Sequence, residues 1–581
     1  MKHKSTIFWL AILAVLFAFL QIRHEFHFYY VEQNQLFQND FAFVADMLFN
    51  VGGLAAALAE FLVQFFIYPF AGAAITAVLL TAAGWLCHSL VKKLSPDSNL
   101  AVFCLLPVAA LLFVHLDYIY LISGTAAFIF ALLSLRLVLQ IRDFYARLAV
   151  EAVLTVVLFL IAGSVFALFA LLAVLIEILF FKSGAKRFLV LILAVEAVFI
   201  AWLSIKCSVY GEYRFAVLPD LYYNSQIKPG SVVHFSWISM VILIIAARLF
   251  KFRTRLLNWI SLAVQAVIII IVCRIGLPKY EFRNSYETKK FDYYCRTEQW
   301  NKILEEGRGK ITNYLKLCYI NLALSERGEL AERMFDFDQR DPKGLMAEWN
   351  KTTGISLLNS DIAYSMNCIA LSQEMAFEAH IGAVDGGNPR ALKRLVETNL
   401  IFGAYPVAEK YIAVLENTLA YRDWAKSQRR FLYDDSAVEN DAALGVKLRS
   451  IPDTNSLSAI AGLDVELQQI AEKNPDSRSA IEYLGALLLL AKDFNGFKSM
   501  IERYSGTPVL PRLPRSFQEA VCVLNEANPS AWASYGVSDD TASRFNRFKQ
   551  TVLANKNNRG GLPSILAPQF GNTYWYFVMF K

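Results

Sequence analysis

Carboxylates occur in a short aromatic segment near the N-terminus. Residues 26–53 read FHFYYVEQNQLFQNDFAFVADMLFNVGG and contain Glu32, Asp40 and Asp46. A carboxylate at the edge of an apolar layer is poorly hydrated, so its pKa rises and it becomes a stronger base. Such a base can take the proton of a hydroxyl nucleophile. We rank Glu32 first and Asp40 second as candidate bases, and we interpret Asp46 and Glu60 as the wet face of surface helices.

Basic and aromatic residues near these carboxylates could bind an anionic substrate. Arg214 is the first choice for an anion, because its planar guanidinium can hold two oxygens at once. The candidate binding residues are Arg23, His24, His27, Arg214, Tyr222, Tyr223, Lys228 and His234. All have a structural alternative, since loops need polar residues to stay hydrated and histidines can serve as interfacial anchors.

The elements that position these residues are mostly apolar. The chain has 581 residues, of which 56% are hydrophobic and 18% charged, and this composition indicates a polytopic membrane protein. A span needs about 20 apolar residues. Nine segments are predicted spans: 6–22, 70–90, 99–115, 119–138, 148–163, 164–181, 188–206, 233–250 and 257–275. The first could instead be a signal peptide, but no small-residue cleavage site follows it. The segment 148–181 could also be one long helix.

The basic residues between the predicted spans set the orientation. Every second connection, counted from the N-terminus, lies on the same side of the membrane. The basic residues on that side are Lys2, Lys4, Lys92, Lys93, Arg136, Arg142, Arg147, Lys182, Lys186, Arg187, Arg248, Lys251, Arg253 and Arg255. The opposite connections carry Arg23, Lys206, Arg214 and Lys228. Cytoplasmic loops are enriched in Lys and Arg. The N-terminus is therefore predicted to be cytoplasmic, and residues 23–69 are predicted to lie outside as a loop with two surface helices. The chain after the ninth span also lies outside the cytoplasm. In a bacterial inner membrane this side is the periplasm.

The composition changes at about residue 278. We predict a membrane domain over residues 1–277 and a helical periplasmic domain over 278–581, because apolar residues recur there at i, i+3 and i+4 among charged ones. Helical pairs are predicted around Gly328, Gly403 and Asp493. In the pair around Gly403, one stripe contains Leu392, Leu395, Val396 and Leu400, and the facing stripe contains Val407, Ala408, Tyr411, Ile412 and Leu415. Such pairs resemble degenerate tetratricopeptide repeats and predict a solenoid whose groove binds polypeptide or holds a membrane partner.

The last segment, FGNTYWYFVMFK, is apolar but too short to span a membrane. It could be a buried strand or helix, or it could dip into the membrane interface. We favour packing against the membrane domain.

The chain also resembles known proteins in two ways. The stretches VEQNQLF, AEFLVQFFIYP, ALKRLVETNL and FGNTYWYF resemble an uncharacterised family of bacterial multi-pass proteins. The layout of the chain resembles C-type (GT-C) glycosyltransferases, which have a cytoplasmic N-terminus, a long first outside loop with two surface helices and a catalytic carboxylate, and often an outside soluble domain. The paired acidic motif common in that superfold is absent. The resemblance implies a polyprenyl-phosphate-linked sugar donor and an acceptor that approaches from outside. It also implies roles for the candidates: Arg214 would bind the departing phosphate, and Tyr213, Tyr222 and Tyr223 would stack on the sugar.

The predicted fold is therefore all-α, with a polytopic membrane domain followed by a tetratricopeptide-like solenoid. The leading hypothesis is a GT-C-type transferase that acts on a membrane lipid carrying a sugar, with a polypeptide as the acceptor or partner. The alternative is a non-enzymatic membrane-anchored scaffold for envelope proteins. Proton-coupled transport through Glu196 is disfavoured, because one central carboxylate is sparse for a path. No nucleic acid is expected, the scattered cysteines form no zinc motif, and a divalent-metal requirement stays open because no dedicated site is visible.

Overall fold

The computed structural model describes residues 2–181, 184–223, 229–250, 254–281, 283–383, 387–453 and 462–581. Its contacts divide the chain into two compact units. Unit 1 is Met1–Tyr286 with two short later segments, and unit 2 is the remainder, from Glu287 to Lys581. The β pairing found among the described residues consists of two isolated bridges, Tyr120 with Tyr223 and Ser505 with Leu510. The predicted all-α class is therefore confirmed for the described part of the chain.

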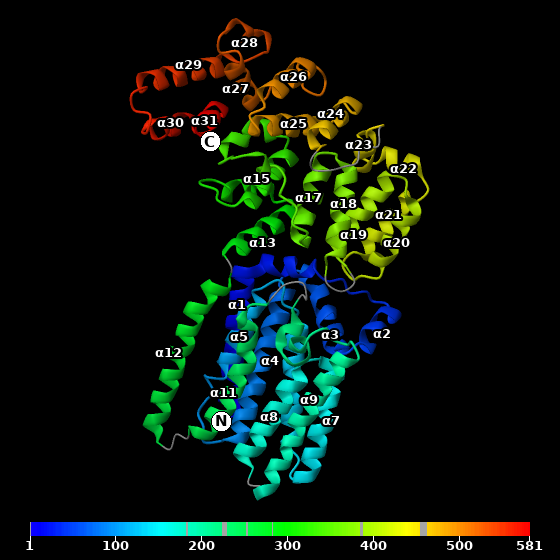
Figure 1. Cartoon of the computed structure of the whole chain (residues 1–581), viewed down its shortest axis with the longest axis vertical. Helices are drawn as coiled ribbons and strands as arrows, with labels where there is room; N and C mark the ends of the chain where they lie inside the picture. The colour runs from blue at the N-terminus through cyan, green and yellow to red at the C-terminus, as the bar shows by residue number, and fades with distance from the viewer. Residues whose placement is uncertain are drawn as a thin grey trace. The chain divides into compact units, whose positions relative to one another are not determined.

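Unit 1 contains long helices such as α1, α4 and α12 (Figure 1). Its elements are α1 (Lys2–Glu32), α2 (Phe41–Phe49), α3 (Gly53–Val63), η1 (Gln64–Ile67), α4 (Ala71–Leu94), α5 (Leu105–His115), α6 (Ser123–Val138), α7 (Phe144–Ala162), α8 (Val165–Phe180), η2 (Gly184–Val190), α9 (Leu191–Lys206), α10 (Tyr213–Val217), η3 (Pro219–Tyr222), η4 (Ser231–His234), α11 (Phe235–Leu249) and α12 (Arg255–Tyr280).

Six of the described helices are long and apolar enough to cross a membrane: those at Ser5–Glu32, Ala71–Leu94, Phe144–Ala162, Phe188–Lys206, Ser231–Leu249 and Leu256–Tyr280. Each of the nine predicted spans contains a helix, but α5, α6 and α8 have only 11, 16 and 16 residues. A helix rises about 1.5 Å per residue, so these three fall short of a roughly 30 Å hydrocarbon layer. The nine-span topology and its orientation stay predictions.

Glycines set two features of unit 1. Gly163 has φ +74, which favours glycine, and it separates α7 from α8. The segment 148–181 is therefore two helices. Gly72 and Gly84 let α1 approach α4 closely, because a Cβ would lie 2.4 Å from the Phe28 ring at Gly72 and 2.6 Å from the Trp9 ring at Gly84. Small residues at helix contacts serve this purpose in apolar surroundings.

Unit 2 is built from shorter helices in consecutive pairs (Figure 1). Its elements are α13 (Arg283–Arg296, which begins in unit 1), α14 (Trp300–Glu306), α15 (Tyr314–Glu326), α16 (Leu330–Arg333), η5 (Met334–Asp336), η6 (Pro342–Gly344), α17 (Thr353–Ser365), α18 (Ile369–Ile381), α19 (Pro389–Ile401), α20 (Tyr405–Glu416), α21 (Arg422–Gln428), η7 (Arg429–Phe431), α22 (Asp435–Asn440), α23 (Leu444–Arg449), α24 (Leu463–Lys473), α25 (Arg478–Leu490), α26 (Phe494–Tyr504), α27 (Arg515–Leu524), α28 (Ser530–Ser534), α29 (Asp539–Ala554), α30 (Leu562–Phe570) and α31 (Tyr574–Phe580).

The three predicted helical pairs are present as α15 with α16, α19 with α20, and α25 with α26. Gly328 and Gly403 turn the chain with φ +65 and +68. The predicted stripe on α19 is buried, whereas Val407 on α20 is 40% exposed and does not join the facing stripe. Whether the pairs form a solenoid stays a prediction.

The C-terminal segment forms α31 and packs inside unit 2. Trp575 is 2% exposed, and its ring lies 5.2 Å from Phe545 and 6.0 Å from Phe548. Phe577 lies 5.3 Å from Phe335. The prediction that this segment packs against the membrane domain is therefore wrong. Its aromatic residues complete the core of the domain that carries them.

Replacing Trp575 should loosen the end of unit 2. Trp575→Ala removes a buried ring and should cost about 3–5 kcal/mol of local stability, while Met579→Ala, at a position that is 47% exposed, should cost little. Amide hydrogen exchange over α29–α31 in the full chain measures the difference. Equal protection in the two variants would contradict this account of the core.

Candidate functional site

The tail of α1 carries polar residues, yet it is buried. His24 has non-helical backbone angles (φ −131, ψ 20), which kink α1 at this point. Beyond the kink, His27 is 2% exposed and Glu32 is 3% exposed. Phe28 anchors the tail over Gly72 of α4. The candidate base Glu32 is therefore buried, and its role stays a prediction.

Two of the candidate binding residues hold a carboxylate of this chain. Arg23 donates to Glu281 through Nε at 2.5 Å and through Nη2 at 2.9 Å. His24 Nε2 lies 3.1 Å from the same carboxylate. These contacts tie α1 to the end of α12 within unit 1. A phosphate at Arg23 or His24 would compete with the Glu281 carboxylate for the same nitrogen atoms.

Asp40 has a structural role at the start of α2. Its carboxylate accepts hydrogen bonds from the backbone N–H groups of Ala42 and Phe43, at 3.1 and 3.2 Å. This is an N-cap, which satisfies amides that the helix leaves unpaired. The two predicted short helices exist as α2 and α3. Asp46 is exposed, but Glu60 is 2% exposed, so its interpretation as part of a wet face is wrong.

The segment after α9 contains the remaining candidates. Arg214 pairs with Glu212, with Nε 2.8 Å from Oε2, and Lys228 lies outside the described residues. Tyr222 is 4% exposed. Its hydroxyl donates to the Ala162 carbonyl at 2.6 Å and accepts from the Val165 N–H at 3.1 Å. Tyr222 therefore supplies partners to the backbone where Gly163 interrupts the helices.

Tyr223 and His234 belong to a larger group, which we call the polar cluster. It comprises His115, Asp117, Tyr120, Thr125, Asp220, Tyr223 and His234.

The polar cluster joins the α5–α6 connection to η3 and the residue after it, and to η4. The Thr125 hydroxyl contacts two other members of the cluster: its Oγ1 lies 2.8 Å from His115 Nε2 and 3.0 Å from the Tyr120 hydroxyl. The Tyr120 and Tyr223 rings lie 5.5 Å apart. Burial, and then the nearby Asp117 carboxylate, raise the pKa of Tyr223. The cluster thus places a carboxylate beside buried phenols.

The Asp220 and His234 pair is the part of the cluster suited to chemistry. Asp220 Oδ2 lies 3.4 Å from His234 Nε2, within ion-pair distance. The Asp220 side chain is 10% exposed, whereas the His234 side chain is 34% exposed. The pair is therefore buried on the carboxylate side and open on the imidazole side. An imidazole beside a carboxylate is an arrangement that general acid and base catalysis uses.

Several buried polar atoms of this region make no hydrogen bond to any described residue: Asp220 Oδ2, His234 Nδ1, Tyr223 OH and Tyr210 OH. An unpaired buried polar atom costs about 1–3 kcal/mol. Unpaired groups that gather in one place indicate a bound water, ion or ligand.

The structure brings some of the predicted residues together and leaves others apart. Tyr223 and His234 share the polar cluster. The α1 tail, which bears His27 and Glu32, approaches the cluster through Tyr30, whose ring lies 5.0 Å from that of Tyr118. Arg23, His24 and Arg214 hold carboxylates elsewhere.

Sequence reasoning missed Asp117 and Asp220. The signal was present in HLDYIYL and VLPDLYY, where an aspartate is flanked by tyrosines and apolar residues. Within the described residues no group of three or more His, Cys, Asp or Glu side chains has the geometry of a metal site.

Unit 2 contains a second charged group, a buried ion-pair network that sequence reasoning also missed. Arg390 donates to Asp292 at 2.8 Å and also pairs with Asp361. Arg394 pairs with Asp361 at 3.2 Å, and its guanidinium lies 3.5 Å from the centre of the Tyr364 ring. The network links α13, α17 and α19.

The network holds the Asp361 carboxylate ionised. Burial alone would raise the pKa of Asp361, but Arg390 and Arg394 outweigh it and hold that pKa below its ordinary value of 3.8. The charges compensate one another, so the network serves to position helices.

These features define a class, an all-helical protein with several helices suited to a membrane. A family model described as "Family of unknown function (DUF6057)" matches residues 2–581. The chain belongs to this family. No curated protein and no solved structure matches the chain at a significant level.

The ion-pair network predicts how unit 2 responds to acid. A carboxylate whose folded pKa is depressed contributes stability above its unfolded pKa and loses it as the pH falls through the folded value. Hydrogen-exchange protection of α17 and α19, corrected for intrinsic rates, should therefore be constant from about pH 8 to 5 and fall at pH values below the ordinary Asp pKa.

Arg390→Met should cost about 3–5 kcal/mol and move this loss to higher pH, because Asp361 then lacks one of its cations. Arg430→Met, at a side chain that is 67% exposed, is the matched control. An acid response unchanged by Arg390→Met would show that the network does not hold these helices.

Proposed function

We propose that this chain is an integral membrane glycosyltransferase of GT-C type, which transfers a sugar from a polyprenyl phosphate at the outer face of the membrane. The polar cluster is the proposed site of transfer. The observation that carries the proposal is the Asp220 and His234 pair, in which Asp220 Oδ2 and His234 Nδ1 are buried and make no hydrogen bond to a described residue.

The layout around the cluster supports this proposal. A long apolar helix kinks at His24, and two short helices separate it from the next long helix. This is the order of elements that the resemblance to GT-C enzymes implies. The polar cluster lies toward the end of unit 1 that carries the α1 tail, since Tyr30 of the tail meets Tyr118. A lipid-linked sugar could enter such a site from the membrane while the acceptor approaches from solvent.

The chemistry assigned to the cluster is a displacement at the anomeric carbon. An acceptor hydroxyl attacks that carbon, the bond from carbon to the phosphate oxygen breaks, and the electron pair leaves with the lipid phosphate. His234 takes the hydroxyl proton while Asp220 stabilises the imidazolium. Glu32 is the alternative base. The leaving phosphate also needs a donor. Arg23 and His24 are paired with Glu281, and Arg214 is paired with Glu212, so each would have to give up its carboxylate to bind the phosphate. Within the cluster, the hydroxyls of Tyr223 and Tyr120 are the donors proposed for this role.

The helical pairs of unit 2 would hold the acceptor. Paired helices stacked side by side form grooves that bind extended polypeptide. The acceptor of this proposal is therefore a polypeptide on the periplasmic side of a bacterial inner membrane.

A membrane-anchored scaffold is the second candidate. It is favoured by the pairing of Arg23 and His24 with Glu281 and of Arg214 with Glu212, because these contacts stabilise the fold and occupy cations that a transferase would use. In a scaffold the polar cluster would hold only ordered water.

Asp220→Asn and His234→Gln, each expressed at the level of the unchanged protein, should lower transfer by about 10²–10⁴-fold, the usual contribution of a general base. The measurement is the glycan profile of envelope proteins in cells that carry each variant. Asp97→Asn is the matched control, since Asp97 is an exposed carboxylate of unit 1 outside the cluster.

Two results would reject the transferase or its assigned base. An unchanged glycan profile after deletion of the gene would reject the transferase and favour the scaffold function. A profile that is lost on deletion but retained by Asp220→Asn and His234→Gln, while Glu32→Gln loses it, would move the base to the α1 tail.

A further inference from the structure

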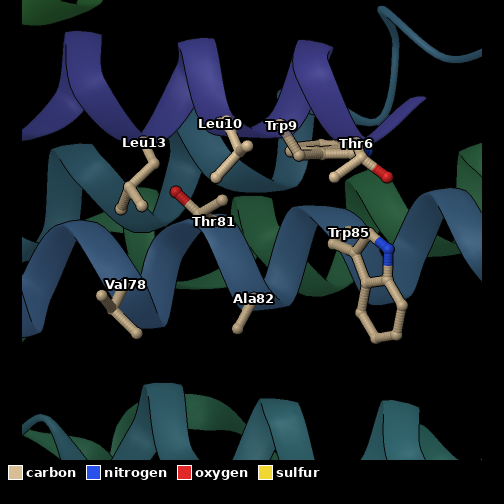
Figure 2. Close-up of a pocket in the computed structure, with 8 residues that line it drawn as sticks. All are labelled: Thr6, Trp9, Leu10, Leu13, Val78, Thr81, Ala82 and Trp85. Carbon is tan, nitrogen blue, oxygen red and sulfur yellow. The ribbon is translucent and has the colours of Figure 1, made fainter. Parts of the chain in front are cut away.

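A groove runs between α1 and α4 of unit 1 (Figure 2). Its volume is about 280 Å³, and it is lined by Thr6, Trp9, Leu10, Leu13, Val78, Thr81, Ala82 and Trp85. The rims are apolar and open, with Leu10 58% exposed and Trp85 51% exposed. Both helices are candidate membrane spans. The groove therefore faces the place that lipid would occupy.

Specific side-chain contacts form the walls of the groove. Trp9 closes its inner wall over Gly84, and the Trp9 indole N–H donates to His88 Nδ1 at 3.0 Å. Thr81 lies in its floor, with a buried hydroxyl that makes no hydrogen bond to any described residue. Figure 2 shows Thr81 pointing toward α1, between Leu10 and Leu13. A polar atom left unpaired in an apolar groove is suited to a ligand with an acceptor oxygen.

One end of the groove is basic. Val78, Trp85 and Lys92 are spaced by seven residues, so they lie on one face of α4. Lys92 and Lys93 are exposed in the last turn of α4. Arg136 of α6 donates from Nε to Ser89 Oγ at 3.0 Å, which fixes a third cation beside that turn.

We propose that this groove binds one acyl chain of an anionic phospholipid, whose phosphodiester is held by Lys92, Lys93 and Arg136. The apolar lining accepts the chain, and the indole of Trp85 lies at the depth of the ester linkages, where tryptophan is favoured. From Val78 to Lys92 the helix rises about 21 Å, more than the roughly 15 Å of hydrocarbon in one leaflet. The lysines thus reach the headgroups while the groove lies among the acyl chains.

An anionic occupant is favoured over a neutral one by charge. Lys92 and Lys93 lie in the last turn of α4 and Arg136 lies beside it. The described residues within hydrogen-bond or ion-pair reach of Lys92 and Lys93 include no carboxylate. A basic side chain near a headgroup attracts an anionic lipid, whereas phosphatidylcholine carries a compensating positive charge. The site shares no residue with the polar cluster, and it stands whether or not the chain is a transferase.

Native mass spectrometry of the purified full chain, titrated with phosphatidylglycerol or phosphatidylcholine of the same acyl chains, tests the proposal. We expect phosphatidylglycerol to bind about 10- to 30-fold more tightly, and Lys92→Gln with Lys93→Gln to abolish that preference. Ala82→Phe, which fills the groove, should reduce binding of both lipids. Arg142→Gln and Val153→Phe are matched controls at exposed positions away from the groove.

Three outcomes would overturn the proposal. Equal binding of the two lipids would mean that any acyl chain fills the groove. A preference for phosphatidylglycerol that survives the lysine variant would place the anion elsewhere. Displacement of phosphatidylglycerol by a much lower concentration of polyprenyl phosphate would assign the groove to a different lipid. If Ala82→Phe does not fold, the lysine variant alone still decides between these outcomes.

Discussion

The close contact between α1 and α4 is the interaction on which both ends of unit 1 depend. Gly72 accepts the ring of Phe28 and Gly84 accepts the ring of Trp9, so the two helices pack closely at these two points. The Phe28 contact fixes the tail of α1 that turns toward Tyr118. The Trp9 contact forms the inner wall of the groove. A side chain at either glycine would separate the helices and displace the elements at that end, because packed interiors transmit changes in volume.

Buried polar groups in this protein fall into two kinds. Tyr222 is fully engaged, since its hydroxyl bonds both sides of the break at Gly163. Gln265 similarly ties α12 to the segment before α5 through Asn99 and Phe103. These contacts account for polar residues that an apolar region would otherwise exclude. Asp220, Tyr223 and His234 differ because atoms of each have no hydrogen-bond partner among the described residues. That contrast directs the functional proposal to the polar cluster.

Local signals in the sequence predicted much of the fold, because glycine turns and apolar periodicity act over a few residues. The turns at Gly328 and Gly403, the break in 148–181 and the two short helices after α1 followed from such signals. Long-range pairing could not be predicted. Nothing near Arg23 indicates that Glu281, 258 residues later, occupies it. In the same way, the sequence indicated Tyr223 and His234 as candidates but not Asp117 and Asp220. The contact between their two segments, about 100 residues apart, could not be predicted from local signals. The burial of α31 in unit 2 also depends on partners that lie far from it in the sequence.

The central claim is that the polar cluster receives a lipid phosphate that carries a sugar. A polyprenyl phosphate with a photoreactive diazirine next to the phosphate, incorporated into nanodiscs with the full chain, tests this directly. The account predicts that light-induced adducts map to residues 116–122 and 229–236, and that unlabelled polyprenyl phosphate competes them away. Adducts confined to other segments, or adducts at the cluster that do not respond to competitor, would contradict the account.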